Sequence, residues 1–137
     1  MKGEWTMQSW KLFYLKNEIS EIHSVSDLEN ILRNIHKYVD VDNPILGLKN
    51  PNGDALTIGI SHNVGFLDYM DSSRNVPYYS SVGNPSLTLE DGCEIFDCGE
   101  ATDIPRRNCI DFNTLIDVVK EFYHTGKLSE SIEWEED

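Results

Sequence analysis

Cysteine and histidine are the usual ligands of zinc in proteins, and two of the three cysteines, Cys93 and Cys98, lie close together. Their spacing is C-x4-C rather than the usual C-x2-C, and no histidine follows at a matching distance. Residues five positions apart in a strand also point to opposite faces, so both thiolates cannot readily hold one ion. We therefore expect both to be small buried hydrophobic residues, with no metal and no cofactor.

The histidines form no recognisable catalytic motif. None of the four lies near a serine or cysteine in an arrangement such as G-x-S-x-G. His36 falls beside the apolar stripe of a predicted helix, as a half-buried boundary residue, and His124 lies at the end of another. We expect no catalytic residue. The alternative is a small enzyme in which His62 and clustered carboxylates converge in space.

Acidic residues dominate the charge of this 137-residue chain, which has 24 Asp and Glu against 11 Lys and Arg and a net charge of −13. Residues 51–104 contain one basic side chain, Arg74, against nine acidic ones, so most of the excess lies there. This charge argues against binding the phosphates of a nucleic acid. The acids also lack the alternating order of a calcium loop. They form either a solvated face or a surface that binds a partner.

Tyrosines lie in or beside the acidic segment, and tyrosine flanked by charge is a frequent anchor at protein interfaces. Strand alternation requires one of Tyr78 and Tyr79 to face the core, so core packing alone explains each of them as well as partner contact does. The candidate partner-binding residues are Asp68, Tyr69, Asp71, Tyr78, Tyr79, Glu94, Asp97, Glu100 and Asp103.

Apolar runs predict an α+β fold, with an antiparallel sheet of about five or six strands and two packed helices, as a single domain over residues 1–137. The Asn52-Gly53 pair tolerates the positive φ of a hairpin turn, and His62-Asn63 offers a second turn, so the three central runs form a meander. The candidate strands are residues 10–15, 45–48, 55–60, 64–70, 77–82, 94–98 and 104–110, with a strand-period pair, Ile132 and Trp134, in the tail.

Two segments have apolar residues at helical spacing. The first covers residues 27–39, where Ser26 and Glu29 have the form of a capping box. The second begins after Asp111 as its N-cap and ends before Gly126. The residues of the second segment that we expect in the core, together with Trp134, are Phe112, Leu115, Val119 and Phe122.

The sequence has no feature of a membrane or exported protein. No run approaches the roughly 18 apolar residues that span a bilayer, and residues 1–5 lack the apolar run of a signal peptide. The odd number of cysteines argues against a disulfide-stapled secreted protein. We expect a cytoplasmic monomer that binds neither membrane nor nucleic acid.

Several short segments from Asn43 onward occur in a characteristic order. The most specific is the end of the second helix, where Phe122 and Gly126 form Phe-x-x-x-Gly and Trp134 follows eight residues later. Together the segments resemble the first immunity-protein family of bacterial polymorphic toxin and contact-dependent systems. Ser129 departs from the family, whose members often have proline there. The other matching segments are residues 55–60, 62–63, 64–71, 83–84 and 104–110.

The resemblance implies an inhibitor that neutralises a cognate toxin by stoichiometric binding in the cytoplasm, the family's usual partners being deaminase toxins. The acidic composition points the same way, because enzymes that act on nucleic acids have basic clefts that an acidic protein can occupy. The chain is not itself a deaminase, since that chemistry needs H-x-E and P-C-x-x-C motifs, and His62-Asn63-Val64 does not supply the first. A generic acidic adaptor for an unrelated protein remains the alternative.

Overall fold

The computed structural model describes residues 9–14, 17–39, 43–97 and 99–137. Within them the chain forms ten strands, two α-helices and a short 3₁₀ helix, η2 (Arg106–Asn108). The helices are α1 (Val25–Lys37) and α2 (Phe112–Thr125). The strands are β1 (Trp10–Tyr14), β2 (Asn17–Ile22), β3 (Ile45–Lys49), β4 (Ala55–Ile60), β5 (Val64–Met70), β6 (Tyr79–Val82), β7 (Cys93–Asp97), β8 (Ala101–Pro105), β9 (Ile110–Asp111) and β10 (Glu133–Glu136). The α+β class is confirmed, but the expected number of five or six strands is too low.

Eight strands form one sheet in the order β10-β6-β5-β4-β3-β1-β2, with β9 paired to the side of β5. The predicted meander is its centre, where β3, β4 and β5 are antiparallel neighbours. The first turn of the meander has Gly53 at a φ of 91°, a conformation that glycine adopts without steric cost. The Asn50 side chain closes this turn by accepting hydrogen bonds from the N–H groups of Asn52 and Asp54 at 3.0 and 2.9 Å.

The additional strands are short or irregular, and this explains why the apolar pattern missed them. β2 pairs with β1 in an N-terminal hairpin. The single strand expected over residues 104–110 is wrong, because β8 ends at Pro105 and η2 follows. Pro105 has no N–H for a strand ladder, and the N–H of Arg106 donates to the carbonyl oxygen of Gly92 at 2.9 Å. Of the residues after η2 in this segment, only those of β9 pair with the main sheet, through β5.

Helix α1 begins two residues earlier than predicted and ends at Lys37 rather than at residue 39. Its N-cap is Ser24 and not the predicted Ser26, which lies inside the first turn; Ser24 Oγ accepts a hydrogen bond from the N–H of Asp27 at 3.0 Å. Glu29 does not complete a capping box, because its carboxylate pairs with Arg33 at 2.8 Å and with Lys120 of α2 at 2.9 Å. These hydrogen bonds lower the pKa of Glu29.

Both predicted ends of α2 are confirmed. The Asp111 carboxylate accepts a hydrogen bond from the N–H of Thr114 at 3.1 Å, which satisfies one of the free donors of the first turn. Gly126 ends the helix at a φ of 73°, and its N–H donates to the carbonyl oxygen of Phe122 at 2.8 Å. A left-handed residue of this kind is the usual helix stop, and glycine favours it.

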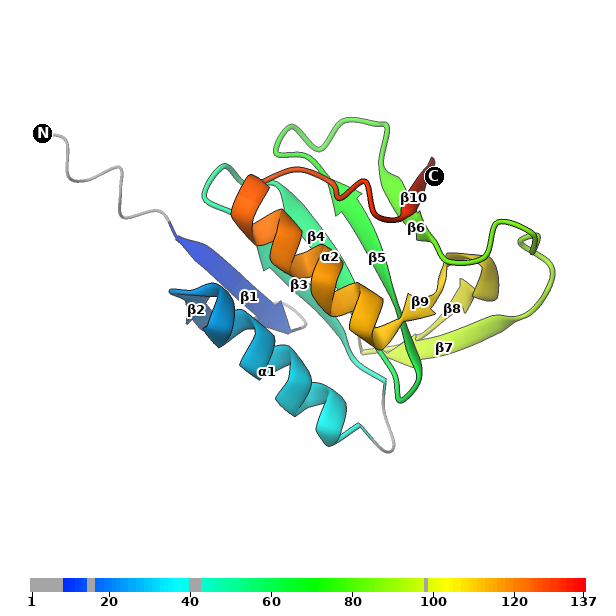
Figure 1. The fold of residues 1–137 in the computed structure, drawn as a ribbon, viewed down its shortest axis with the longest axis horizontal. Helices are drawn as coiled ribbons and strands as arrows, with labels where there is room; N and C mark the ends of the chain where they lie inside the picture. Colours follow the sequence, from blue (N-terminus) through cyan, green and yellow to red (C-terminus); the bar gives the residue numbers. More distant parts are fainter. Residues whose placement is uncertain (1–8, 15–16, 40–42, 98) are drawn as a thin grey trace, which may run out of the picture.

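The core lies between the main sheet and the two helices, which cover the same face of the sheet (Figure 1). The four core residues predicted on α2 are all buried. Phe122 is 1% exposed and meets the Trp10 ring edge-on, with ring centroids 5.3 Å apart. Trp134 is only half-buried, because β10 is at the edge of the sheet. It packs against the margin of the core, and its Nε1 donates to the carbonyl oxygen of Ser129 at 2.8 Å.

Strands β7 and β8 form a separate antiparallel hairpin on the opposite face of the main sheet. Gly65 of β5 faces Leu115 of α2, so the next residue, Phe66, points away from the helices. The Phe66 ring meets the fully buried ring of Phe96 from β7, with centroids 5.0 Å apart. A side chain in place of Gly59 would collide with both rings, so this glycine lets the hairpin approach the sheet.

The buried position of Phe122 predicts a large loss of stability on truncation. Phe122→Ala should lower the free energy of unfolding by about 3–5 kcal/mol, because it leaves a cavity between α2, β1 and β5. Urea unfolding followed by circular dichroism measures this loss. Leu89→Ala, at a side chain that is 63% exposed, should change stability by less than about 0.5 kcal/mol. Equal stability of Phe122→Ala and the wild type would contradict the placement of α2.

Candidate functional site

The nine residues predicted to bind a partner fall into two groups in the structure. The first five lie on β5, on β6 and in the loop that joins these strands. The other four, Glu94, Asp97, Glu100 and Asp103, lie on the β7–β8 hairpin. Phe66 and Phe96 pack the hairpin against the main sheet. The first group therefore lies on the main sheet and its loop, and the second lies on the separate two-stranded sheet.

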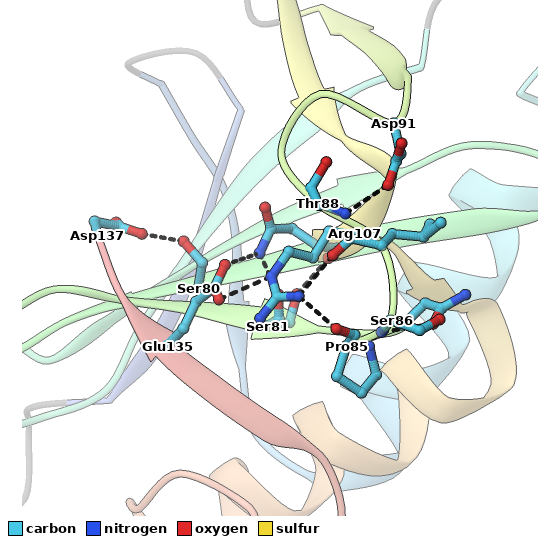
Figure 2. Close-up of polar contacts among 12 residues, drawn as sticks. Ser80, Ser81, Pro85, Ser86, Thr88, Asp91, Arg107, Glu135 and Asp137 are labelled. Atoms are coloured by element: carbon cyan, nitrogen blue, oxygen red, sulfur yellow. Dashed lines mark hydrogen bonds and ion pairs between the residues drawn. The ribbon is translucent and has the colours of Figure 1, made fainter.

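Asp68 lies close to a second carboxylate, that of Asp137, where β5 pairs with β6. Ser80 Oγ is 2.7 Å from Asp68 Oδ1 and also contacts a carboxylate oxygen of Asp137 (Figure 2). A hydroxyl has one proton to donate, so one of the two carboxyl groups must itself be protonated if both contacts are hydrogen bonds. Burial raises the pKa of Asp68 to about 6 against the effect of the Ser80 hydrogen bond, and the charge of Asp137 raises it further. Asp68 therefore changes its protonation near neutral pH.

The remaining members of the first group have structural contacts of their own. Tyr69 packs against the core, its ring centroid 6.1 Å from that of Phe122, and burial raises the pKa of its hydroxyl. Tyr79 is half-buried and pairs with Tyr69 across the strands, so it lies on the helix-covered face. The Tyr78 hydroxyl donates to the carbonyl oxygen of Arg74 at 2.7 Å. These tyrosines are thus partly engaged in holding the sheet edge and its loop.

Asp71 belongs to the same loop and shapes it. Its Oδ1 accepts hydrogen bonds from the N–H and the hydroxyl of Ser73 at 2.9 and 2.6 Å. The hydroxyl bond is the main reason that the pKa of Asp71 lies below its ordinary value. Asp71 therefore acts as a turn-forming residue of the kind common in loops.

One face of the β7–β8 hairpin is turned outward. Alternation along β7 sends Phe96 and Glu94 inward, while Cys93 and Ile95 are exposed on the other side. Asp103 of β8 lies directly opposite Ile95 and is also exposed. Ile95 is 55% exposed, which is unusual for a large aliphatic residue in a strand and was not predicted from the sequence. The expectation that Cys93 is buried is wrong, because the strand turns its side chain outward.

Acidic groups surround Ile95 at the turn end of the hairpin. Asp97 Oδ1 accepts a hydrogen bond from the N–H of Gly99 at 2.7 Å, and Glu100 is exposed. The N–H of Asp97 donates to the carbonyl oxygen of Asn43 at 2.7 Å, which ties the strand to the segment before β3. The hairpin therefore carries an exposed aliphatic side chain next to carboxylates on a strand that is packed against the main sheet through Phe96.

Two adjacent arginines of η2 supply the positive charge that the acidic segment lacks. Arg106 Nε donates to Glu94 Oε2 at 3.2 Å, on the inner side of the hairpin. Glu94 is therefore a structural partner of Arg106 and not part of the outward acidic face. The sequence position of Glu94 among the acids gave no sign of this difference.

Arg107 holds the loop that runs from β6 to β7. Its Nη1 donates to the carbonyl oxygens of Pro85 and Leu87 at 2.8 and 2.7 Å. Its Nε pairs with Glu135 of β10 at 3.0 Å, so the guanidinium lies between the loop and the last strand (Figure 2). Its own carbonyl oxygen accepts from the N–H of Gly83 at 2.9 Å. One residue thus joins three segments that are far apart in the sequence.

Asn108 extends this network into the interior. Its Nδ2 donates to the carbonyl oxygen of Ser81 at 2.9 Å and to Glu135 Oε2 at 2.8 Å. Ser81 Oγ donates back to the carbonyl oxygen of Asn108 at 2.8 Å. The bonds from Asn108 and Arg107 lower the pKa of Glu135. Buried polar groups with all partners in place fix one arrangement of the chain, which here is the junction of β6, η2 and β10.

The alternative of a small enzyme centred on His62 gains no support from the geometry. His62 is exposed, and its contacts are with His36, whose Nε2 lies 2.7 Å from the His62 carbonyl oxygen. His36 is half-buried as predicted and stacks on Phe112. Burial raises the pKa of the Cys109 thiol to about 11, which keeps it in the less nucleophilic protonated form.

No group of three His, Cys, Asp or Glu side chains in the described ranges is placed to hold a metal ion. Cys98, one of the two cysteines considered as ligands, lies outside those ranges. In the same part of the chain, neither helix is long and apolar enough to cross a membrane.

The raised pKa of Asp68 predicts that the free energy of unfolding depends on pH through this residue. The folded protein keeps this proton up to about pH 6, whereas the unfolded chain releases it near 3.8. The contribution of Asp68 to stability therefore falls as pH rises through this interval. The free energy of unfolding of Asp68→Asn, relative to that of the wild type, should increase by on the order of 2 kcal/mol as the pH is raised from about 4 to about 7.5. Urea unfolding at both pH values measures the difference. The exposed Asp103→Asn is the matched control, and parallel profiles for both variants would contradict the assignment.

The family relationship of the chain follows from one comparison. No match was found among curated proteins. The model of the family described as Immunity protein Imm1 matches residues 17–136, a range that contains both helices and every strand from β2 to β10. The resemblance drawn from the helix end and the central hairpin is thereby confirmed. The chain belongs to the Imm1 family of immunity proteins.

Proposed function

We propose that this protein neutralises a cognate bacterial toxin in the cytoplasm by stoichiometric binding, and that it acts as an inhibitor rather than as an enzyme. Membership of the Imm1 family carries this proposal. The described residues add an acidic, rigidly supported surface and no assembled catalytic group. A surface of this kind is suited to a protein partner whose complementary face is basic.

The outward face of the β7–β8 hairpin is the part of the acidic surface best suited to the toxin. It combines Asp97, Glu100 and Asp103 with the exposed side chain of Ile95. An apolar anchor surrounded by charge is a common arrangement at interfaces, where the anchor is desolvated and the charged rim guides the encounter. Because Phe96 is completely buried against the main sheet, little ordering of the hairpin is needed on binding.

A deaminase that acts on a nucleic acid is the proposed toxin. Such an enzyme needs a basic surface to bind phosphates, and the hairpin offers carboxylates in place of those phosphates. Asp68 of the β5–β6 group is less suited to this role, because it is largely buried and contacts Ser80.

Co-purification tests the function directly. The protein should bind, in an equimolar complex, a toxin domain with H-x-E and P-C-x-x-C motifs encoded beside its gene, and should abolish deamination of a single-stranded nucleic acid by that domain. Binding without inhibition would indicate an adaptor. Inhibition that continues after the protein is removed, or that needs far less than one equivalent, would contradict stoichiometric neutralisation.

Association kinetics test the hairpin surface. The triple variant Asp97→Asn, Glu100→Gln and Asp103→Asn should lower the association rate and weaken its dependence on salt, because complementary charge acts mainly on the encounter. The Debye length is about 8 Å at physiological salt, so the effect should shrink as salt is added. Stopped-flow or biosensor measurements at two salt concentrations give both values.

A control variant that removes the same number of carboxylates elsewhere shows whether the association rate depends on their location or only on the net charge of the protein. The triple variant Asp27→Asn, Asp117→Asn and Glu136→Gln removes three exposed carboxylates from α1, α2 and β10, and it should change the association rate less. Ile95→Ala should raise the dissociation rate, while Val76→Ala, at a side chain that is 77% exposed, should not. Superimposable association rates for both triple variants would remove the hairpin from the interface.

A further inference from the structure

A groove of about 430 Å³ lies between the first turn of α2 and the segment that leads into β10. Val82, Ile110 and Ile132 give it apolar walls. Gly83 and Pro85 form the side that belongs to the β6–β7 loop, and residues 130–133 form the other side. The volume is at the small end of the range for ligand-binding clefts. The groove is separate from the outward face of the hairpin, but the loop that borders it continues into β7.

Both sides of the groove are held in place by hydrogen bonds. The N–H groups of Gly83 and Asn84 donate to the carbonyl oxygen of Arg107, at 2.9 and 3.2 Å. Gly83 is required for this approach, because a side chain there would collide with the backbone of Cys109. Arg107 Nη1 adds the bond to the carbonyl oxygen of Pro85 that Figure 2 shows.

The opposite side is fixed by Ser129, which is 2% exposed. Its Oγ contacts Glu121 of α2 and accepts a hydrogen bond from the N–H of Ser131 at 3.0 Å. Its carbonyl oxygen accepts the indole N–H of Trp134. The segment that carries the groove's carboxylates is therefore anchored to both α2 and β10, and a ligand would meet a preformed shape.

The charge in the groove is entirely negative. Asp111, Glu130 and Glu133 line it, and no described lining residue is basic. Asp111 caps α2 through the N–H of Thr114. The side chains of Glu130 and Glu133 are exposed and have no hydrogen bond or ion pair with another described residue, whereas the backbone of Glu133 pairs with Val82 of β6. The partial positive charge of a helix N-terminus is about half an elementary charge, so three carboxylates exclude an anion and favour a cation.

We propose that this groove receives an arginine side chain of the toxin. The apolar walls suit the methylene stem of arginine, and Glu130 and Glu133 suit the guanidinium, which forms geometrically specific pairs with carboxylates. A compact inorganic cation would leave the apolar walls unused. This proposal rests on the proposed function for the identity of the partner. The chemistry of the groove stands without it.

A tripeptide titration tests the groove without any toxin. The probe is acetyl-Gly-Arg-Gly-amide, and the control peptide has citrulline, a neutral isostere, in place of arginine. Methyl NMR signals of Ile110, Ile132 and Val82 should shift with the arginine peptide at millimolar concentrations. The citrulline peptide should bind about fivefold more weakly, the value expected when two partly exposed ion pairs are lost.

The matched variants complete this test. Glu130→Gln with Glu133→Gln should weaken binding of the arginine peptide by a similar factor, whereas Asp27→Asn with Asp117→Asn should leave it unchanged. Equal shifts for the two peptides, or no shift, would overturn the proposal. The same groove variant should speed dissociation of the co-purified toxin complex. If the toxin binds and this variant dissociates like the wild type, the groove assignment fails while the proposed function stands. If no toxin binds but the groove prefers the arginine peptide, the proposed function fails while the preference of the groove for arginine stands.

Discussion

The arrangement of the acidic segment depends on two cations that lie outside it. Residues 51–104 contain nine carboxylates and one basic side chain, so they cannot neutralise themselves. Arg106 and Arg107 follow immediately, on the 3₁₀ turn that ends β8, and they point to different segments. Arg106 pairs with Glu94 on the inner side of the hairpin. Arg107 binds the carbonyl groups of the β6–β7 loop and the carboxylate of Glu135. The remaining carboxylates of the hairpin are left to face outward.

Such an arrangement separates the paired carboxylates, which hold segments together, from the exposed ones that we propose contact the toxin. Glu94 and Glu135 are paired and hold segments together, whereas Asp103 and the groove residue Glu130 lie on the surface. Exposed like charges repel one another, and a fold tolerates them where packing holds their segments in place. Here the buried contact of Phe96 with Phe66 holds the hairpin, and Ser129 holds the segment before β10. The proposed toxin supplies the missing positive charge, so the binding free energy includes relief of this repulsion.

The sequence predicted the fold where local chemistry decides the structure. The meander, the Asp111 cap and the Gly126 stop follow from turn residues and apolar spacing, and the structure has all three. The sequence-based prediction failed where a residue far away in the sequence determines the local structure. Glu29 looks like a capping residue until Lys120 of α2 is placed beside it. Glu94 looks like any other acid until Arg106 turns back toward it. Ile95 could be recognised as outward only once Phe96 was known to be buried. The groove depends on Arg107, which joins residues 20 to 28 positions away in the sequence.

Hydrogen–deuterium exchange on the toxin complex tests most directly whether the surface organised by Arg106 and Arg107 meets the toxin. Backbone amides of free and toxin-bound protein would be compared across the whole chain. Slower exchange in the bound state should concentrate in residues 83–105 and 130–133, which carry the loop, the hairpin and one side of the groove. Protection confined to the exposed faces of α1 and α2, with residues 83–105 unchanged, would contradict this account.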